Sequence, residues 1–230
     1  KWQISPITKR RLNSFRANRR GYWSFWIFLV LFTLTLFAEL IANDKPLLVS
    51  YKGEIFYPVI KVYPETIFGG DFLTEAEYRE KDVQLLIEKK GGWILWAPIR
   101  YSYGTINFGL KVPAPSPPSW ENLLGTDDQA RDVLARVIYG FRVCVIFGLV
   151  LTFLSSVVGI FVGAIQGFFG GWTDLILQRL IEVWESIPLL YLLIILAAVI
   201  TPGFWSLLLI LLFFSWLILF KKFLFISLFS

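Results

Sequence analysis

The sequence predicts an all-α membrane protein with about four transmembrane helices and one large water-exposed insert after the first of them. Apolar residues make up 56% of the 230 residues and charged residues only 17%, whereas a soluble domain carries about a quarter charged residues. The mean hydropathy is +0.63. Long apolar runs in such a charge-poor chain indicate that lipid surrounds the helices.

Residues 1–21 form a basic arm, which we predict to lie in the cytoplasm. The first twenty residues carry seven Lys and Arg residues and no acidic residue. A basic arm can bind nucleic acid, but this one adjoins an apolar run, and Lys and Arg beside a span are retained on the cytoplasmic side. We therefore expect contact with membrane lipid and no nucleic-acid partner. Because the first residue is Lys1, we expect a processed chain or one whose true start precedes it.

The first transmembrane helix is predicted over residues 22–42. No charged residue lies between Trp23 and Phe37. Roughly 20 apolar residues exceed the apolar region of a signal peptide, and no cleavage pattern of small residues follows, which favours an uncleaved anchor. With the arm inside, the chain emerges on the extracytoplasmic side near Asn43.

Residues 43–142 are predicted to form an extracytoplasmic insert of mixed α and β structure. Its 12 basic and 13 acidic residues make it nearly neutral. Short β-like stretches are expected at residues 54–60 and 93–100. A helix is expected at residues 74–90, because Thr74 and the glutamate three residues later have the spacing of a capping box.

Three more transmembrane helices are predicted within residues 143–220. The second helix, residues 143–167, has small residues at every fourth position that let another helix approach closely, namely Gly159, Gly163 and Gly167. The third, residues 174–200, is expected to bend at Pro188. The fourth covers residues 204–220 and is followed by two lysines, which lie in the cytoplasm by alternation.

The third predicted helix carries two charged residues three positions apart, Arg179 and Glu182. Residues with this spacing lie on one face of a helix and can pair. Charges inside a membrane are costly and often functional. An interfacial ion pair and an intramembrane pair on a pathway both remain open interpretations.

No arrangement typical of catalysis, cofactor binding or metal binding occurs in the sequence. The chain has no His and one Cys, Cys144, so an internal disulfide is excluded and a metal site of imidazole or paired thiolate ligands is not expected. A glycine-rich phosphate loop with a lysine is also absent. We therefore expect no enzyme activity, no cofactor, no catalytic residue and no metal ligand.

The segment before the second predicted helix carries the most distinctive group of residues. They are Gly125, Thr126, Asp127, Arg131, Asp132, Arg136, Tyr139, Gly140 and Arg142. From the residues alone, Thr126 or Asp127 can cap a short amphipathic helix. Arg131, Asp132 and Arg136 would then lie on its polar side. This interpretation places an amphipathic helix at the membrane entrance, at the end of the insert.

This segment resembles the signature that precedes the transport core in permease subunits of peptide and nickel-type ABC importers, the binding-protein-dependent transport permease family. The matching blocks are Leu-Gly-Thr-Asp at residues 124–127, Arg-Asp-Val-Leu-x-Arg at 131–136 and Tyr-Gly-x-Arg at 139–142. The resemblance continues through residues 163–171 and 186–188. Within the insert, residues 41–48 and 92–100 are similar to the subgroup that serves oligopeptide and microcin C uptake.

The resemblance implies the first part of the six-helix fold of an ABC importer permease, with residues 143–220 as helices two to four of the transport core. It implies a subunit that forms part of the translocation path for peptides or peptide-like compounds of the microcin C type, as a multi-pass protein of the bacterial inner membrane. The implied partners are a sister permease in a heterodimer, cytoplasmic ATPase subunits that hydrolyse the ATP, and an extracytoplasmic peptide-binding protein. The sequence does not give the transported substrate, since specificity in such importers is expected to reside largely in the binding protein.

The pattern departs from the family after Trp216, and residues 221–230 form an atypical tail rich in Phe, Leu and Lys. Family members continue with a cytoplasmic coupling loop, which has a Glu-Ala-Ala-like core, and two more helices. We therefore expect a product truncated at the C-terminus, for example by a frameshift. Such a chain would not transport alone, because an ATPase has no coupling helix to grip. Two alternatives are a membrane-anchored receptor or sensor that works through the insert, and a structural membrane protein that scaffolds a complex through its glycine faces.

Overall fold

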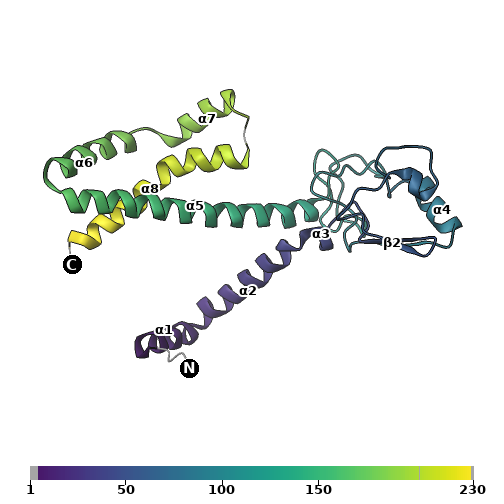
Figure 1. Cartoon of the computed structure of the whole chain (residues 1–230), viewed down its shortest axis with the longest axis horizontal. Coiled ribbons are helices and arrows are strands. Elements are labelled where there is room, and N and C mark those ends of the chain that lie inside the picture. Colours follow the sequence, from purple (N-terminus) through teal and green to yellow (C-terminus); the bar gives the residue numbers. More distant parts are fainter. Residues whose placement is uncertain (1–4, 202, 229–230) are drawn as a thin grey trace. The chain divides into compact units, whose positions relative to one another are not determined.

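The computed structural model of the chain describes residues 5–201 and 203–228, the side chains of Thr173 and of residues 217–228 excepted (Figure 1). Lys1 and the rest of residues 1–4 of the basic arm lie outside the described residues, as do Pro202 and residues 229–230 of the tail. The chain divides into two compact units, Lys1–Arg142 and Val143–Ser230. Each unit has its own internal packing.

The first unit begins with three consecutive helices, α1 (Pro6–Ala17), α2 (Arg19–Leu36) and α3 (Ala38–Ile41). Asn18 separates α1 from α2 and caps α2, because its side-chain oxygen accepts a hydrogen bond of 3.2 Å from the N–H of Gly21. Phe37 separates α2 from α3. The first predicted transmembrane helix, residues 22–42, is therefore helical for most of its length, but in two pieces.

A three-stranded antiparallel sheet with the strand order β2-β1-β3 forms the β part of the insert. Its strands are β1 (Leu48–Tyr51), β2 (Glu54–Phe56) and β3 (Trp93–Leu95). Val49 on the central strand lies opposite Phe56 on one side and Ile94 on the other. Strands predicted within residues 54–60 and 93–100 are confirmed for the first three residues of each range. No strand was predicted from the sequence at the position of β1.

A small apolar core lies between this sheet and two helices, the 3₁₀ helix η1 (Glu65–Phe68) and α4 (Lys81–Lys89). Phe68 from η1 and Ile87 from α4 are fully buried, together with Val49 of β1. Aromatic rings make edge contacts inside this core, with the ring centroids of Tyr51 and Phe68 5.6 Å apart. The insert therefore has a packed core of its own.

The helix predicted at residues 74–90 begins later, at Lys81, so the capping box predicted at Thr74 is wrong. The backbone around Thr74 pairs with the segment before η1 instead. The Glu65 N–H donates to the Thr74 carbonyl oxygen at 3.1 Å, and the Ala76 N–H donates to a carbonyl oxygen of that segment at 3.0 Å. Backbone groups engaged in this way are not free to form the first turn of a helix.

Helix α5 (Val133–Phe169) begins in the first unit and continues into the second, which also contains α6 (Gly171–Glu185), α7 (Leu189–Val199) and α8 (Phe204–Leu228). Because α5 is continuous, the predicted amphipathic helix at the membrane entrance and the predicted second transmembrane helix are one helix of 37 residues. Gly170 and Gly171 have positive φ angles of 52° and 53°. They form the turn at which the chain reverses between α5 and α6 (Figure 1).

The bend predicted at Pro188 is confirmed, because α6 ends at Glu185, α7 begins at Leu189, and the chain direction changes by 70° between them. Within the described residues, α5 is the one helix that is long and apolar enough to cross a membrane by itself, and α6 with α7 qualifies as a bent pair. At about 1.5 Å per residue, α5 is roughly 55 Å long, against an apolar membrane core of about 30 Å. That the chain has about four transmembrane helices stays a prediction.

Candidate functional site before helix α5

The distinctive segment before α5 forms a loop, residues 125–132, that ends where the helix begins. Gly125 opens the loop with a φ of 74°, and a Cβ at this position would lie only 2.4 Å from the carbonyl oxygen of Ser116. The Thr126 N–H donates to that same oxygen at 3.1 Å. In return, the Ser116 N–H donates to Thr126 Oγ1 at 2.9 Å. These reciprocal bonds fix the start of the loop against the proline-rich segment of the insert.

Asp127 is the acceptor at the centre of this loop. Its Oδ1 accepts hydrogen bonds of 2.9 Å from the N–H groups of Gln129 and Arg131. Its Oδ2 accepts from the guanidinium groups of Arg131, at 2.8 and 2.9 Å, and of Arg136. Desolvation alone would raise the pKa of this carboxyl, but the hydrogen bonds from Arg131, Gln129 and Arg136 outweigh it and lower the pKa to about 2. Asp127 is therefore ionised at neutral pH, and its hydrogen bonds and ion pairs close the loop.

Asp132 joins the loop to the helix. Its Oδ1 accepts a hydrogen bond of 2.7 Å from the Ala135 N–H, in the first turn of α5. Its Oδ2 accepts from Asn122 Nδ2 at 2.8 Å, and Asn122 Oδ1 in turn accepts from Asn107 Nδ2 at 3.1 Å. All three side chains are buried. This chain of hydrogen bonds links the start of α5 to two separate segments of the insert.

The sequence-based prediction of the cap is wrong by several residues. The helix begins at Val133, with Asp132 in the capping position, and neither Thr126 nor Asp127 caps it. Asp132 is 1% exposed and does not lie on a polar outer face. The reason is that Asp127 is engaged by Arg131 within the loop, which leaves Asp132 as the carboxylate nearest the free N–H groups of the helix.

Tyr139 and Arg142 connect α5 to the end of the first predicted transmembrane segment. The Tyr139 hydroxyl donates to the Ala42 carbonyl oxygen at 2.8 Å. Arg142 Nη1 lies 2.9 Å from both carboxylate oxygens of Glu39, and its guanidinium lies 5.0 Å from the centre of the Tyr139 ring. Gly140, by contrast, is exposed, and a Cβ there would meet nothing within 4 Å. Eight of the nine residues of the motif therefore take part in the loop, in the cap of α5, or in the contacts of α5 with Ala42 and Glu39, and Gly140 takes part in none of these.

The three glycines predicted to mediate helix packing differ in their surroundings within the second unit. Gly159 and Gly163 are buried. Gly167 is exposed, with nothing within 4 Å of a Cβ placed on it. On the same face of α5 as Gly159, the Ser155 hydroxyl is hydrogen-bonded to the Ser215 hydroxyl of α8. The closely packed face therefore ends before Gly167.

Arg179 and Glu182 lie on α6 as an exposed ion pair, with 2.6 Å between Arg179 Nη1 and Glu182 Oε2. Both side chains are exposed within the second unit. The structure of this unit therefore gives no reason to assign Arg179 and Glu182 to a translocation pathway. Among the residues that the structure describes, no group of three or more Cys, Asp or Glu side chains is arranged to hold a metal ion.

No family model matches the chain. Individual relatives match it closely. The chain is 54% identical to the peptidoglycan transport system permease protein YejE of Agrobacterium fabrum, over 93% of this chain and 62% of that protein. It is 52% identical to the inner membrane ABC transporter permease protein YejE of Escherichia coli, over 94% of this chain and 63% of that protein. The dipeptide transport system permease protein DppC of Haemophilus influenzae is 41% identical over 38% of this chain and 32% of that protein.

The chain is similar over 93–94% of its length to two transport permeases, and over 38–54% of its length to dipeptide and oligopeptide transport permeases. The family resemblance found in the sequence is thereby confirmed. The chain spans 62–63% of the length of the two YejE proteins. Its mostly helical structure, with one long apolar helix, is consistent with an all-α membrane protein.

Two residues that complete the polar network around Asp132 were not predicted from the sequence. Asn122 lies ten residues before Asp132, and Asn107 lies 15 residues before Asn122. A single sequence has no local pattern that marks an asparagine whose partner lies so far along the chain. The sequence did mark Glu39 as unusual, because an acidic residue near the end of an apolar segment needs a partner. It did not identify Arg142 as that partner.

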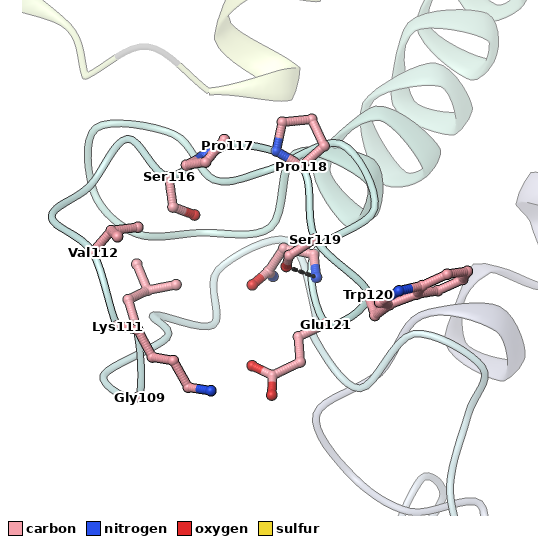
Figure 2. Close-up of a pocket in the computed structure, with 11 residues that line it drawn as sticks. Gly109, Lys111, Val112, Ser116, Pro117, Pro118, Ser119, Trp120 and Glu121 are labelled. Atoms are coloured by element: carbon pink, nitrogen blue, oxygen red, sulfur yellow. Dashed lines mark hydrogen bonds between the residues drawn. The ribbon is translucent and has the colours of Figure 1, made fainter.

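A cavity of 260 Å³ lies beside this network, between residues 109–112 and 116–122 of the insert. Figure 2 shows Trp120 projecting away from the side of the cavity that Lys111 and Val112 form. The Asn122 N–H donates to Ser119 Oγ at 3.1 Å, so the wall of the cavity is joined to the residue that holds Asp132. The loop, the wall of the cavity and the start of α5 are thus joined by hydrogen bonds within the first unit.

Proposed function

We propose that this permease forms part of the translocation path of an ABC importer for peptides or peptide-like compounds. The observation that carries the proposal is its 52–54% identity to two transport permeases over 93–94% of the chain. The name of a third relative, a dipeptide transport permease, supports peptides as the class of substrate. In this function, separate cytoplasmic ATPase subunits hydrolyse ATP, and the permease changes shape without performing a reaction.

The proposed arrangement has four transmembrane helices in the bacterial inner membrane: α2 with α3, α5, the bent pair α6–α7, and α8. The seven Lys and Arg residues among the first twenty support a cytoplasmic N-terminus. The insert, residues 43–142, then faces the extracytoplasmic side. There it meets a peptide-binding protein, while a sister permease completes the heterodimer within the membrane.

The loop before α5 has a mechanical part in this proposal. Asp132 and Tyr139 both belong to α5 or its cap, and both are bonded to residues outside the helix, Asn122 and Ala42. A force that a docked binding protein exerts on the insert therefore reaches the start of α5 through buried hydrogen bonds. Buried, fully paired polar networks are rigid, which is what such a transmission requires.

Two subclasses of substrate have specific support. The similarity of residues 41–48 and 92–100 to the microcin C importer subgroup favours microcin C-type peptides. The name of the Agrobacterium fabrum relative, a peptidoglycan transport permease, favours peptide fragments of peptidoglycan. Both subclasses are peptide-like, and both are compatible with the function proposed here.

Deleting the gene for this permease from its own host tests the proposal. We expect the deletion to abolish uptake of a labelled tripeptide, a microcin C-type peptide or a peptidoglycan-derived peptide, and a plasmid copy of the gene to restore it. The compound whose uptake is lost identifies the subclass. Unchanged uptake of all three compounds would contradict the proposal.

Co-purification with ATP-binding subunits distinguishes an importer permease from the two alternatives, a membrane-anchored receptor or sensor and a structural membrane protein, since neither alternative requires an ATPase.

A further inference from the structure

The insert contains a second and larger cavity, of 690 Å³, on which the proposed transport function does not depend. Sites for small molecules occupy about 300–1,000 Å³, so this cavity is large enough for a ligand of a few amino acids. Four segments of the insert contribute to its wall, and the charged and aromatic members are Arg79, Lys81, Arg100, Glu121, Trp96, Tyr101 and Trp120.

The charges around this cavity are unbalanced. Three cations, Arg79, Lys81 and Arg100, face one carboxylate, Glu121. Elsewhere in the described part of the chain, ion pairs such as Arg142 with Glu39 are formed, yet no ion pair involves any of these three cations. The cavity therefore holds positive charge that is available to an anion.

The two arginines are held in place by aromatic rings. The Arg79 guanidinium lies 4.4 Å from the centre of the Tyr101 ring, and that of Arg100 lies 5.4 Å from the centre of the Trp96 ring. A guanidinium carries several N–H groups at its edge, and two of them match the two oxygens of a carboxylate. Tyr101 is buried, which gives this side of the cavity a fixed shape.

Trp120 lies at the edge of the same cavity and is 96% exposed. Tryptophan is highly buried on average in folded proteins, and an indole ring is well suited to contact a ligand because it is large and rigid. The side chain is therefore positioned to cover an apolar part of whatever occupies the cavity.

We propose that this cavity binds a peptide-like ligand that carries a carboxylate next to an aromatic or apolar side chain. The carboxylate is bound by Arg79 and Arg100, and the apolar part packs against Trp120. A free phosphate would satisfy the cations but would leave the indole ring without a contact. The hollow shape favours a small ligand over a flat protein surface.

The test is direct binding to the full chain in detergent micelles, without ATPases or a sister permease, so its outcome is independent of whether the chain transports. The probe is the tripeptide Ala-Phe-Glu with free carboxylates, measured by isothermal titration calorimetry. The matched ligand is the uncharged analogue Ala-Phe-Gln amide. We expect the acidic peptide to bind and the analogue to bind at least tenfold more weakly, because the analogue has no carboxylate to accept hydrogen bonds from the charged guanidinium groups.

Three variants locate the site. Arg100→Gln and Trp120→Ala are each expected to weaken binding of the acidic peptide about tenfold or more, while the circular dichroism spectrum stays unchanged, since both side chains are exposed. Lys61→Gln is the control, because Lys61 also lies over an aromatic ring, that of Tyr63, but does not line the cavity. Equal binding of the two peptides, equal affinity of Arg100→Gln and the unmodified chain, or full competition by inorganic phosphate with no effect of Trp120→Ala would each overturn the proposal.

Discussion

The carboxylate of Asp132 accepts a hydrogen bond of 2.8 Å from the side-chain amide of Asn122, and each of these side chains is only 1% exposed. The other carboxylate oxygen caps α5 through the Ala135 N–H. One side chain therefore has two structural roles, at the start of the longest helix and inside the insert. Removing it leaves the amide of Asn122 buried without this acceptor, which costs the desolvation of that group in full.

Asp132→Ala should destabilise the first unit by about 2–4 kcal/mol, the sum of a lost helix cap and a buried amide without its partner. Thermal unfolding of the purified chain in detergent measures the loss. Hydrogen exchange locates it, with faster exchange expected at Ala135 and in the first turn of α5. Asp128→Ala is the control, because Asp128 is an exposed aspartate in the same loop. Equal stability of the two variants would contradict the assigned role of Asp132.

Asp127 makes the stability of the loop depend on pH. Its pKa is lowered from 3.8 to about 2, so folding favours the ionised carboxylate. A lowered pKa gives stability that is fully present above about pH 5 and is lost as the pH falls from about 4 through 2. A pKa shift of this size corresponds to a contribution of about 2 kcal/mol to the free energy of unfolding. Solvent screening reduces this contribution only a little, because the Asp127 side chain is only 15% exposed.

Asp127→Asn is expected to remove that part of the pH dependence. The free energy of unfolding in urea, measured between about pH 5 and 2, should fall less steeply for Asp127→Asn than for the unmodified chain. Asp128→Asn, which changes the neighbouring and exposed carboxylate, should leave the slope as it is. Identical slopes for all three proteins would show that the contacts of Asp127 with Arg131 and Arg136 do not stabilise the loop.

Gly125 and Gly140 offer a matched pair of substitutions within one motif. Gly125→Ala should destabilise the insert by more than about 1 kcal/mol, since its positive φ disfavours any side chain and the new Cβ would meet the Ser116 carbonyl oxygen at 2.4 Å. Gly140→Ala should be neutral or stabilise α5 by up to about 1 kcal/mol, because the position is helical and open. Thermal melting of both variants tests the contrast, and a stable Gly125→Ala would refute it.

Long-range hydrogen bonds explain what the sequence could and could not predict. The apolar helices and the bend at Pro188 were predictable, since an apolar run and a proline act locally. The cap of α5 was not, because the choice of Asp132 over Asp127 depends on Asn122 and on Arg131 together. Strand β1 is only four residues long, and it is a strand because β2 and β3 flank it.

The candidate site itself was found by its family pattern and not by its chemistry. Arg131, Arg136 and Asp127 look like solvated loop charges in the sequence, yet the structure joins them in one cluster. The error at Thr74 has the same origin, because a capping-box spacing is a local signal and the backbone pairing with Glu65 overrides it. The cavity around Arg100 draws on four segments, so no single stretch of sequence predicts it.

The buried face of α5 gives a final prediction, on the second unit. Gly163 is buried, whereas Gly167, one turn further along, is exposed with nothing near it. Gly163→Leu should therefore push apart the helices that pack on this face and cost about 1–3 kcal/mol, with a lower melting temperature in detergent and loss of a monodisperse peak in gel filtration. Gly167→Leu adds the same side chain in open space and should leave both measurements unchanged. If the two variants behave alike, the small residues of α5 do not mediate packing within this unit.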